Sequence, residues 1–339
     1  MARGWRAALE LLPADSTVLL NADDPAVAAL GEGLAAQVRY YGLEDTRHAG
    51  GGATHFADSQ FCRRCGAPYV YSAIFYAHVG HYACPVCGQR RPMPDFRLER
   101  LEIEGTTGAR LFLSFPAPGG HDARGYLELR LPLPGLYNAL NALAAAAAGL
   151  LLGVAPARVR HTLASFSSAF GRIERVDAGG KPLLLALIKN PVGASETVRM
   201  LTSQQSAVDG QQSAPSAATQ NSGLKTQDLL YLLVAINDKY ADGTDVSWLW
   251  DADFERLAGR AADVVVSGTR AADMAVRLKY AGVDADRLTV EPDLARALDL
   301  ALARLPGGAT LYALPTYTAM LELRAELARR GWVKPFWED

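Results

Sequence analysis

Four cysteines constrain this chain more than any other feature, because they are its only cysteines and fall into two pairs of equal spacing. Cys62 and Cys65 form one Cys-x2-Cys pair, Cys84 and Cys87 form the other, and eighteen residues separate the pairs. A glycine follows each pair directly and permits the tight turn of a metal-binding knuckle. Two such knuckles bring four thiolates to one ion in the tetrahedral arrangement that Zn²⁺ favours. The pattern predicts a zinc ribbon whose closed site is structural rather than catalytic.

Two other uses of four cysteines stay open at this point. Disulfides suit an even number but are rare in cytosolic proteins, and an iron–sulfur cluster also takes four thiolates. His78 and His81 lie between the knuckles, and we expect them to be ordinary hairpin residues. The same segment interleaves arginines such as Arg63 with several tyrosines, a composition that can follow a single nucleic-acid strand. A solvated hairpin with its own small core is the simpler interpretation.

Length, composition and charge exclude several classes of protein. With 339 residues the chain is long enough for two domains, and half of its residues are hydrophobic, which excludes a wholly disordered chain. The net charge of −2 argues against a general nucleic-acid binder, which is usually basic. The longest apolar run, 142–154, is shorter than the roughly 20 residues that span a bilayer, and the first residues lack the apolar core of a signal peptide. We expect a cytoplasmic protein with no transmembrane segment and no nucleic-acid partner.

The first half predicts an α/β domain, 1–176, into which the ribbon is inserted at about 55–94. A short apolar strand at 16–20 runs into Pro25, which begins a helix that we expect to reach about residue 36, with Asp24 as its cap. Turn residues between two apolar segments predict a hairpin after the ribbon. We expect further strands at 38–41, 96–103, 109–115 and 125–131, and helices at 137–152 and 155–166.

The second half predicts a second domain, 177–339, in which short buried strands alternate with helices. This alternation is typical of a parallel, Rossmann-like sheet, whose ligands bind at the carboxyl ends of the strands. A segment rich in Ser, Gln and Ala, at about 202–223, predicts a flexible surface loop. We expect strands at 182–188, 229–236, 263–266, 288–290 and 310–314, and helices at 192–203, 246–258, 270–281, 292–304 and 316–330.

Several short motifs occur in an order that resembles one family. In sequence they are NADDP at 21–25, the four-cysteine ribbon, GLYNALN at 135–141, GRIERV at 171–176, KNP at 189–191, NDKYADGTDVSWLWD at 237–251, SGTR at 267–270 and LPTYTAM at 314–320. Together they resemble the Mur ligase superfamily, and most closely the MurT subunits of lipid II isoglutaminyl synthase. Ordinary Mur ligases lack the ribbon. The resemblance implies an α/β fold: an incomplete Mur-ligase-type central ATPase domain with an inserted zinc ribbon, followed by a Rossmann-like C-terminal domain.

The resemblance also implies a reaction. The family amidates the α-carboxylate of D-glutamate in the stem peptide of lipid II, using ATP and Mg²⁺ to form an acyl phosphate that ammonia attacks. A separate GatD-type glutaminase subunit with a Cys nucleophile and a His base supplies the ammonia, so the implied partners are GatD and lipid II. Because lipid II is anchored in the membrane, we expect a protein that acts at its cytoplasmic face in peptidoglycan biosynthesis.

One catalytic residue is implied by motif position. In the family an aspartate of the synthetase subunit completes the triad of the glutaminase, and this position corresponds to Asp251. An orienting carboxylate fixes the tautomer of the histidine and stabilises the imidazolium that forms. The alternative is that Asp251 only caps or solvates a helix. Asp238, Asp245 and Asp253 are the other candidates for the triad carboxylate.

Five further residues are candidates for nucleotide binding. Asn138 and Asn141 are three positions apart, so on a helix they project from one side and both could reach one adenine base; the alternative is a helix cap and one buried amide. Arg172 is a candidate phosphate contact, with an interdomain ion pair as its alternative. Lys189 and Asn190 correspond to a nucleotide-facing loop of related ligases.

The sequence departs from the family at the phosphate-binding loop. Mur ligases cradle the ATP phosphates with backbone N–H groups of a glycine-rich loop that ends in Gly-Lys-Thr, and this motif does not occur in the 339 residues. The family places the loop upstream of the strand at 16–20. We expect a chain truncated at its N-terminus; the alternatives are a loop supplied by another chain and a protein that does not bind ATP. Two competing functions follow: a degenerate ligase that only docks to and activates the glutaminase, and a non-catalytic zinc-ribbon adaptor.

Overall fold

The computed structural model describes residues 2–50, 59–117, 123–166, 173–203 and 229–334. The chain divides into two compact units, Met1–Ser167 and Ser168–Asp339. The expected boundary at 176/177 falls inside one strand of the second unit, β8 (Glu174–Asp177), because this strand pairs with β9 (Pro182–Leu185). The division therefore lies earlier in the chain than the sequence analysis placed it.

The first unit is built on a five-stranded sheet with the order β1-β2-β5-β6-β7. Strands β1, β2 and β5 run parallel, and β5, β6 and β7 pair antiparallel, as the hairpin prediction requires. All the strands expected in this half are present. Their bounds are Thr17–Asn21 (β1), Gln37–Leu43 (β2), Phe96–Glu104 (β5), Gly108–Pro116 (β6) and Arg124–Leu131 (β7).

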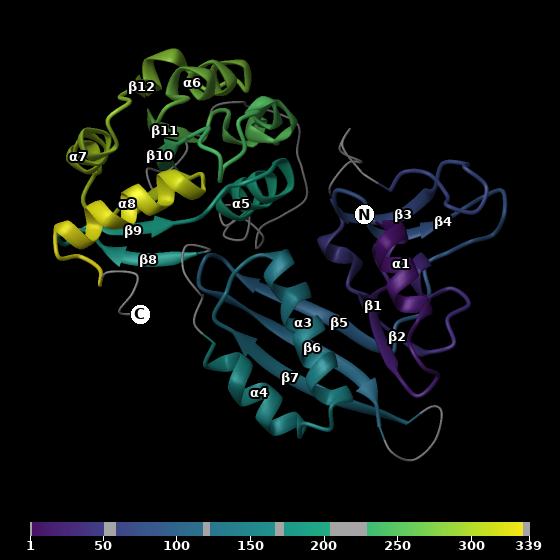
Figure 1. The fold of residues 1–339 in the computed structure, drawn as a ribbon. Coiled ribbons are helices and arrows are strands. Elements are labelled where there is room, and N and C mark those ends of the chain that lie inside the picture. Colours follow the sequence, from purple (N-terminus) through teal and green to yellow (C-terminus); the bar gives the residue numbers. More distant parts are fainter. Residues whose placement is uncertain (1, 51–58, 118–122, 167–172, 204–228, 335–339) are drawn as a thin grey trace, which may run out of the picture. The chain divides into compact units, whose positions relative to one another are not determined.

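Two helices complete the core of this unit. Figure 1 shows helix α3 (Leu136–Leu151) lying along the sheet and α4 (Pro156–Ala164) beside β7. The alanine-rich face of α3 packs on the inward-facing leucines of β5, β6 and β7, which alternate with polar residues along each strand. An N-terminal helix, α1 (Ala2–Glu10), packs against the first strand through Leu9.

The helix expected at 25–36 is much shorter. Helix α2 spans only Pro25–Ala28, and the chain then tightens into a 3₁₀ turn, Ala29–Gly31. Asp24 caps α2 as expected, because its carboxylate accepts hydrogen bonds from the backbone N–H groups of Ala26 and Val27. Gly31 lies so close to Tyr40 that a Cβ atom there would be 2.5 Å from the tyrosine hydroxyl. The helical path ends at Glu32, whose backbone is extended, and Gly33 follows with a positive φ of 67°.

The ribbon forms a separate two-stranded sheet between β2 and β5 in the sequence. Strands β3 (Val70–Tyr76) and β4 (Val79–Ala83) pair antiparallel. A 3₁₀ turn, Thr46–His48, precedes it. Residues 55–58 of the expected insertion lie outside the described residues.

The second unit carries a six-stranded sheet with the order β12-β11-β10-β13-β9-β8. The first five strands in this order pair parallel, as expected, and β8 adds an antiparallel edge that the sequence analysis did not anticipate. The remaining strand bounds are Leu230–Ala235 (β10), Ala261–Ser267 (β11), Leu288–Val290 (β12) and Leu311–Pro315 (β13).

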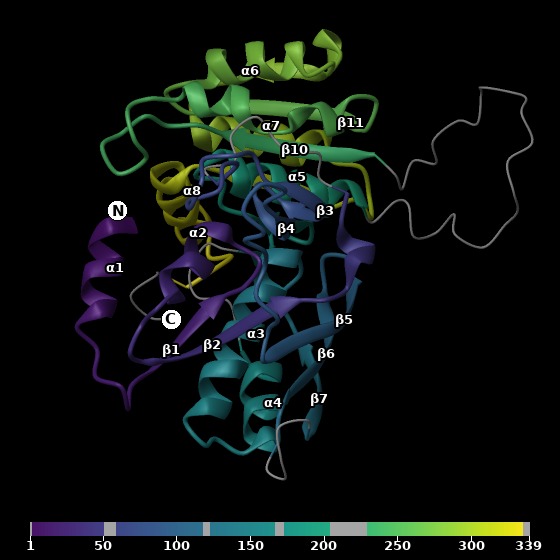
Figure 2. The same ribbon diagram turned by 90° about the vertical axis from the view of Figure 1, so that its right-hand side faces the viewer.

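Helices cover both faces of this sheet. Along β10, Leu232 and Val234 face one apolar cluster, with α5 (Pro191–Ser203) and α6 (Ala271–Tyr280), whereas Leu233 faces the other cluster. That second cluster contains α7 (Leu294–Arg304) and α8 (Tyr317–Arg329). Figure 2 shows the strands between α6 on one side and α8 on the other. The second unit is therefore a three-layer α/β domain.

One helix expected in the second unit is absent from the described residues. In place of a helix at 246–258 the chain forms two 3₁₀ turns, Ser247–Asp251 and Phe254–Leu257, separated by an extended Ala252. The prediction was based on apolar residues at helical spacing. In the structure these residues pack into the core from two short turns instead of from one helix. Most of the loop predicted at 202–223 lies outside the described residues, and its first two residues belong to α5. A search of the described helices finds none of a length and apolarity suited to crossing a membrane.

Candidate functional site

The two cysteine knuckles have the same backbone geometry. In the first, the N–H of Cys62 donates to the carbonyl of Ala67 (2.7 Å) and the N–H of Gly66 donates to the carbonyl of Cys62 (2.8 Å). In the second, the N–H of Cys84 donates to Gln89 (2.6 Å) and that of Gly88 to Cys84 (3.1 Å). Both glycines adopt a positive φ, 75° and 74°, so the sequence was right to link them with the turn.

The four sulfur atoms converge on one point. The Sγ atoms of Cys62 and Cys87 are 3.4 Å apart, those of Cys65 and Cys84 are 3.5 Å apart, and all four lie within 4.8 Å of one another. Four thiolates around an ion at about 2.3 Å have sulfur–sulfur edges of about 3.8 Å in an ideal tetrahedron. The observed sulfur–sulfur distances, from 3.4 Å to at most 4.8 Å, include this value. The four sulfur atoms are therefore placed to bind one tetrahedral metal ion.

The protonation of the thiols supports the same interpretation. Burial raises the pKa of the Cys62 thiol, but hydrogen bonds from the backbone N–H groups of Cys65 and Arg64 outweigh it and lower this pKa to about 6. The N–H of Ala67 favours the thiolate of Cys65, yet hydrogen bonding to the neighbouring sulfurs, Cys84 foremost, raises its pKa to about 12. The sulfurs thus compete for negative charge, and a central cation is what allows all four to be thiolates.

A buried glutamine connects the cysteine cluster to Glu32, which lies outside the ribbon. The Gln89 Oε1 atom accepts a hydrogen bond from the Tyr69 hydroxyl (2.8 Å) and lies 3.0 Å from the Cys62 Sγ atom, and its Nε2 atom donates to Glu32 (2.7 Å). Glu32 also pairs with Arg64 of the first knuckle. Neither Gln89 nor Glu32 was predicted from the sequence. The position of Gln89 directly after a knuckle is a weak signal, and Glu32 has no comparable local signal.

A buried ion pair joins the ribbon to the sheet. Asp23, at the end of β1, is fully buried; it accepts from Arg91 Nε (2.7 Å) and from the N–H of Leu43 (2.8 Å). Burial raises the pKa of Asp23, and the Arg91 charge opposes this rise. His78 contacts Asp24 and His81 contacts the Leu43 carbonyl, so both expected hairpin histidines also hold the ribbon to the sheet.

The two candidate adenine contacts differ in exposure. Asn138 is buried in the first turn of α3, where its Nδ2 atom donates to the carbonyl of Pro134 (2.7 Å). Asn141 is exposed on the same helix. Gly135, with φ 93°, is the N-cap residue, so Asn138 does not cap this helix.

The remaining nucleotide candidates lie elsewhere. Lys189 and Asn190 are exposed and follow β9 in the second unit, where the Lys189 ammonium lies 6.0 Å from the centre of the Tyr317 ring. The Asn190 side chain accepts a hydrogen bond from the N–H of Gly193 (2.8 Å) in the first turn of α5. Arg172 lies outside the described residues.

Asp251 differs from the other three candidates for a triad carboxylate. Asp238 accepts from the Thr269 hydroxyl (2.8 Å), Asp245 from the N–H of Ser247 (2.8 Å), and Asp253 from Arg256 (2.6 Å). Asp251 is half-buried at the end of a 3₁₀ turn, and its carboxylate has no hydrogen bond or ion pair with the described residues.

The carboxyl ends of β10 and β13 carry a polar network that begins at Asn237. This buried residue accepts from the N–H of Thr269 (3.0 Å), and its amide donates to Thr318 (3.0 Å) and Glu322 (3.2 Å). Asp242 in turn accepts from the N–H of Thr318 (2.8 Å). The sequence analysis located polar residues at these strand ends but not the links among them.

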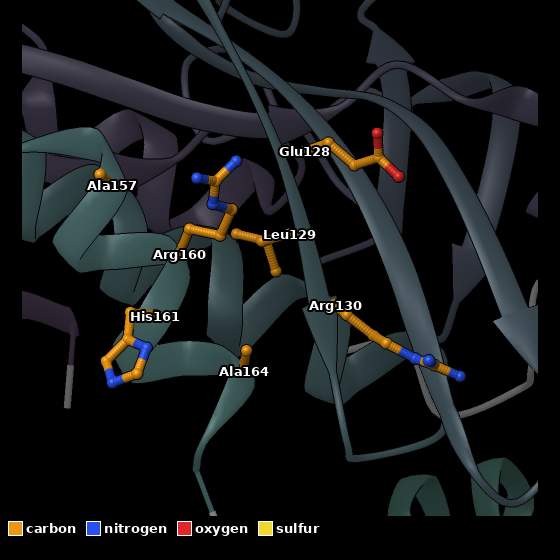
Figure 3. Close-up of a pocket in the computed structure, with 7 residues that line it drawn as sticks. All are labelled: Glu128, Leu129, Arg130, Ala157, Arg160, His161 and Ala164. Carbon is orange, nitrogen blue, oxygen red and sulfur yellow. The ribbon is translucent and has the colours of Figure 1, made fainter.

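A surface hollow of about 610 Å³ lies between β7 and α4. Figure 3 shows Glu128, Leu129 and Arg130 from the strand, and Arg160 and His161 from the helix. Arg130 points away from the helix and pairs with Glu104. None of the candidate residues from the sequence lines this hollow.

Sequence comparisons identify relatives over most of the chain. Residues 187–320 match the family described as MurT ligase C-terminal. The chain is 32% identical over 320 residues to a Streptococcus pneumoniae protein named lipid II isoglutaminyl synthase (glutamine-hydrolyzing) subunit MurT, which covers 94% of this chain and 63% of that protein. The Staphylococcus aureus protein of the same name is 29% identical, with 92% and 62% covered. The chain thus spans slightly less than two thirds of the length of these relatives.

Solved structures share the fold at low identity. A pseudomurein peptide ligase type C from Methanothermus fervidus aligns with a TM-score of 0.60 and 21% identity, over 93% of this chain and 56% of that one. MurF from Acinetobacter baumannii aligns with a TM-score of 0.56 and 17% identity, over 97% and 54%. These likenesses show a Mur ligase fold. Together with the sequence relatives they identify the chain as a homologue of the MurT subunits of lipid II isoglutaminyl synthase, with a MurT ligase C-terminal region at residues 187–320.

Proposed function

We propose that this chain is the synthetase subunit of a complex that amidates the α-carboxylate of D-glutamate in the lipid II stem peptide. A GatD-type glutaminase subunit supplies the ammonia. The names of the curated relatives, which describe a glutamine-hydrolysing synthase with MurT as one subunit, support this assignment. The substrate places the complex at the cytoplasmic face of the membrane.

The observation that carries the proposal is the uncommitted carboxylate of Asp251. An aspartate that completes a triad in another subunit has to keep its oxygens available for the partner's histidine. Asp238, Asp245 and Asp253 each bind a local donor, whereas Asp251 is held in a defined turn with no such donor among the described residues. Asp251 is therefore the triad carboxylate in this proposal.

The chemistry links two half-reactions. In the glutaminase, the partner's cysteine attacks the glutamine amide, ammonia leaves, and water hydrolyses the thioester to glutamate. Asp251 accepts a hydrogen bond from the histidine and stabilises its protonated form. In the synthetase, the D-glutamate carboxylate attacks the γ-phosphate of ATP and ADP leaves. Ammonia then attacks the acyl phosphate, and phosphate leaves as the amide forms.

Other residues take supporting roles in the proposal. Cys62, Cys65, Cys84 and Cys87 hold one structural Zn²⁺ ion, since a site with four protein ligands has no open position for catalysis. The candidate contacts for Mg-ATP are Asn138, Asn141, Arg172, Lys189 and Asn190. Of these, Asn190 also caps α5.

The test is glutamine hydrolysis by the complex of this chain with a GatD-type subunit. Asp251→Asn is expected to lower the hydrolysis rate by about 10⁴-fold, because asparagine favours the wrong tautomer of the histidine. Asp253→Asn is the matched control: it removes a carboxylate two residues away whose one partner among the described residues is Arg256, and should leave the rate unchanged. Calorimetric titration verifies that both variants bind the partner as the parent chain does.

Three results separate the proposal from its alternatives. Unchanged hydrolysis with Asp251→Asn contradicts the triad role. If the complex hydrolyses glutamine but mass spectrometry detects no ATP-dependent amidation of lipid II, the chain is a docking and activating subunit. A chain that binds no glutaminase is a ribbon adaptor instead.

A further inference from the structure

A buried arginine lies directly behind the Asp251 turn. Arg277, on α6, is 2% exposed, and its guanidinium faces the segment 249–255. Its Nε atom donates to the carbonyl of Leu249 (2.9 Å), and one of its Nη atoms donates to the carbonyl of Ala252 (2.7 Å). These two carbonyls flank Asp251 in the chain, so one rigid planar group fixes the backbone on both sides of the aspartate.

A neighbouring carboxylate, that of Glu255, balances the charge of the same guanidinium. The Nη2 atom that contacts Ala252 also lies 2.8 and 2.9 Å from the two carboxylate oxygens of Glu255. The Trp250 and Phe254 rings each lie 5.5 Å from the guanidinium carbon. Burying a charge is costly unless it is paired and hydrogen-bonded, and Arg277 meets both conditions. Its contacts are concentrated on this single turn.

The hydrogen bonds of this segment differ from those of an α-helix. In an α-helix the carbonyls of Leu249 and Ala252 accept from N–H groups four residues further along. Here the carbonyl of Leu249 accepts from Arg277, while the N–H of Asp253 donates to the Ser195 hydroxyl (3.0 Å). The carbonyl of Ala252 accepts from both Arg277 and the N–H of Phe254 (2.9 Å), and the segment forms two 3₁₀ turns with an extended Ala252 between them. Asp251 is the last residue of the first 3₁₀ turn, directly before the extended Ala252.

We propose that Arg277 is a positioning residue for the glutaminase reaction: it holds the Asp251 turn in the conformation that presents the carboxylate to the partner's histidine. This inference rests on the proposed triad role of Asp251 and deepens it. Arg277 touches no reacting atom, and its effect passes through the backbone of residues 249–252. Misplacing a catalytic group by about 1 Å can cost about a hundredfold in rate.

The test compares variants of Arg277 in the complex with a GatD-type glutaminase. Arg277→Lys keeps the charge but loses the planar fork, and is expected to lower kcat for glutamine hydrolysis about tenfold. Arg277→Met removes both carbonyl contacts and should lower kcat about a hundredfold. The KM for glutamine and the affinity of the complex should stay within about twofold, because Arg277 contacts neither glutamine nor the partner's glutamine site.

Controls distinguish positioning from a general loss of structure. Arg324→Lys alters another buried arginine of this unit, which pairs with Glu174 and lies on α8, on the opposite face of the sheet; kcat should not change. Glu255→Gln keeps the carbonyl contacts of Arg277 and should lower kcat less than Arg277→Lys does.

The outcomes distinguish the triad role of Asp251 from the positioning role of Arg277. If Asp251→Asn leaves hydrolysis unchanged, the proposed function fails and this inference fails with it. If Asp251→Asn abolishes hydrolysis but a folded Arg277→Lys variant retains full kcat, only the positioning role is overturned. Loss of complex affinity in parallel with kcat, or an equal effect of Arg324→Lys, also overturns it, because Arg277 would then act on the fold and not on the turn.

Discussion

The ribbon and the Asp251 turn are held in place by opposite means. In the ribbon, ligands two residues apart form each knuckle, and each knuckle closes through backbone hydrogen bonds between neighbours. In the turn, the organising group is Arg277, which comes from a different element more than twenty residues along the chain. A short sequence pattern therefore specifies the first site, whereas the second depends on tertiary packing.

The contrast extends to what each site does with charge. The ribbon concentrates four thiols that need a cation before all can ionise. The turn instead keeps one carboxylate uncommitted and uses a buried cation only on backbone carbonyls and Glu255. One site closes around its ligand, and the other leaves its charged group available to a partner.

Loss of one metal ligand should produce the largest effect. Cys84→Ser is expected to reduce bound metal from about one equivalent to near zero, because structural zinc binding is worth about 10–16 kcal/mol in small zinc modules. Elemental analysis measures the metal, and thermal unfolding measures the stability of the first unit. Val86→Ser, an exposed substitution in the same knuckle, should change neither quantity. If Cys84→Ser also abolishes the glutaminase activity of the complex, the ribbon and the turn are not independent.

Much of the fold could be predicted because its signals are local. Alternating or continuous apolar runs predicted the strands of both sheets except β8, and the paired cysteines predicted the ribbon. The helix expected at 25–36, which is shortened, and the helix expected at 246–258, which is missing, show the limit of prediction from local sequence. The first one gives way to a 3₁₀ turn after Ala28 and ends at the extended Glu32, and a side chain at Gly31 would collide with Tyr40. The second one is replaced by two 3₁₀ turns whose carbonyls bond to Arg277, a contact that no window of sequence around 246–258 contains.

The same limit applies to the candidate sites. The sequence identified Cys62, Cys65, Cys84 and Cys87, and the structure confirms that they cluster. It did not identify Arg91, Gln89 or Glu32, since a partner for a buried carboxylate has no fixed spacing in the chain. The roles of Asp251 and the nucleotide candidates stay predictions that the experiments above test.

Removing Arg91 should separate the folding of the ribbon from its attachment to the sheet. Arg91→Met leaves the fully buried Asp23 carboxylate without its counter-charge, and breaking such a pair typically costs about 3–5 kcal/mol. Urea unfolding should show this loss, while metal content stays unchanged because the knuckles do not use Arg91. Adding Asp23→Asn should recover part of the stability by removing the buried charge. Loss of metal in Arg91→Met would instead show that the ribbon cannot fold without the sheet.

A smaller and pH-dependent effect should mark the neighbourhood of the turn. Glu196, on α5, is buried beside Ser195, whose hydroxyl accepts from the N–H of Asp253. Burial raises the pKa of Glu196 to about 7 from its ordinary 4.5, although the charges of Arg199 and Arg256 oppose the rise. The folded state then holds this proton more tightly than the unfolded chain, so stability should fall by about 3 kcal/mol between pH 4.5 and 7 and stay low above it. Glu196→Gln should flatten this slope and stabilise the protein at pH 8, as measured by urea unfolding at several pH values. An unchanged slope would mean that Glu196 ionises in the folded protein much as it does in water, and that the packing of α5 against the turn does not exclude solvent from it.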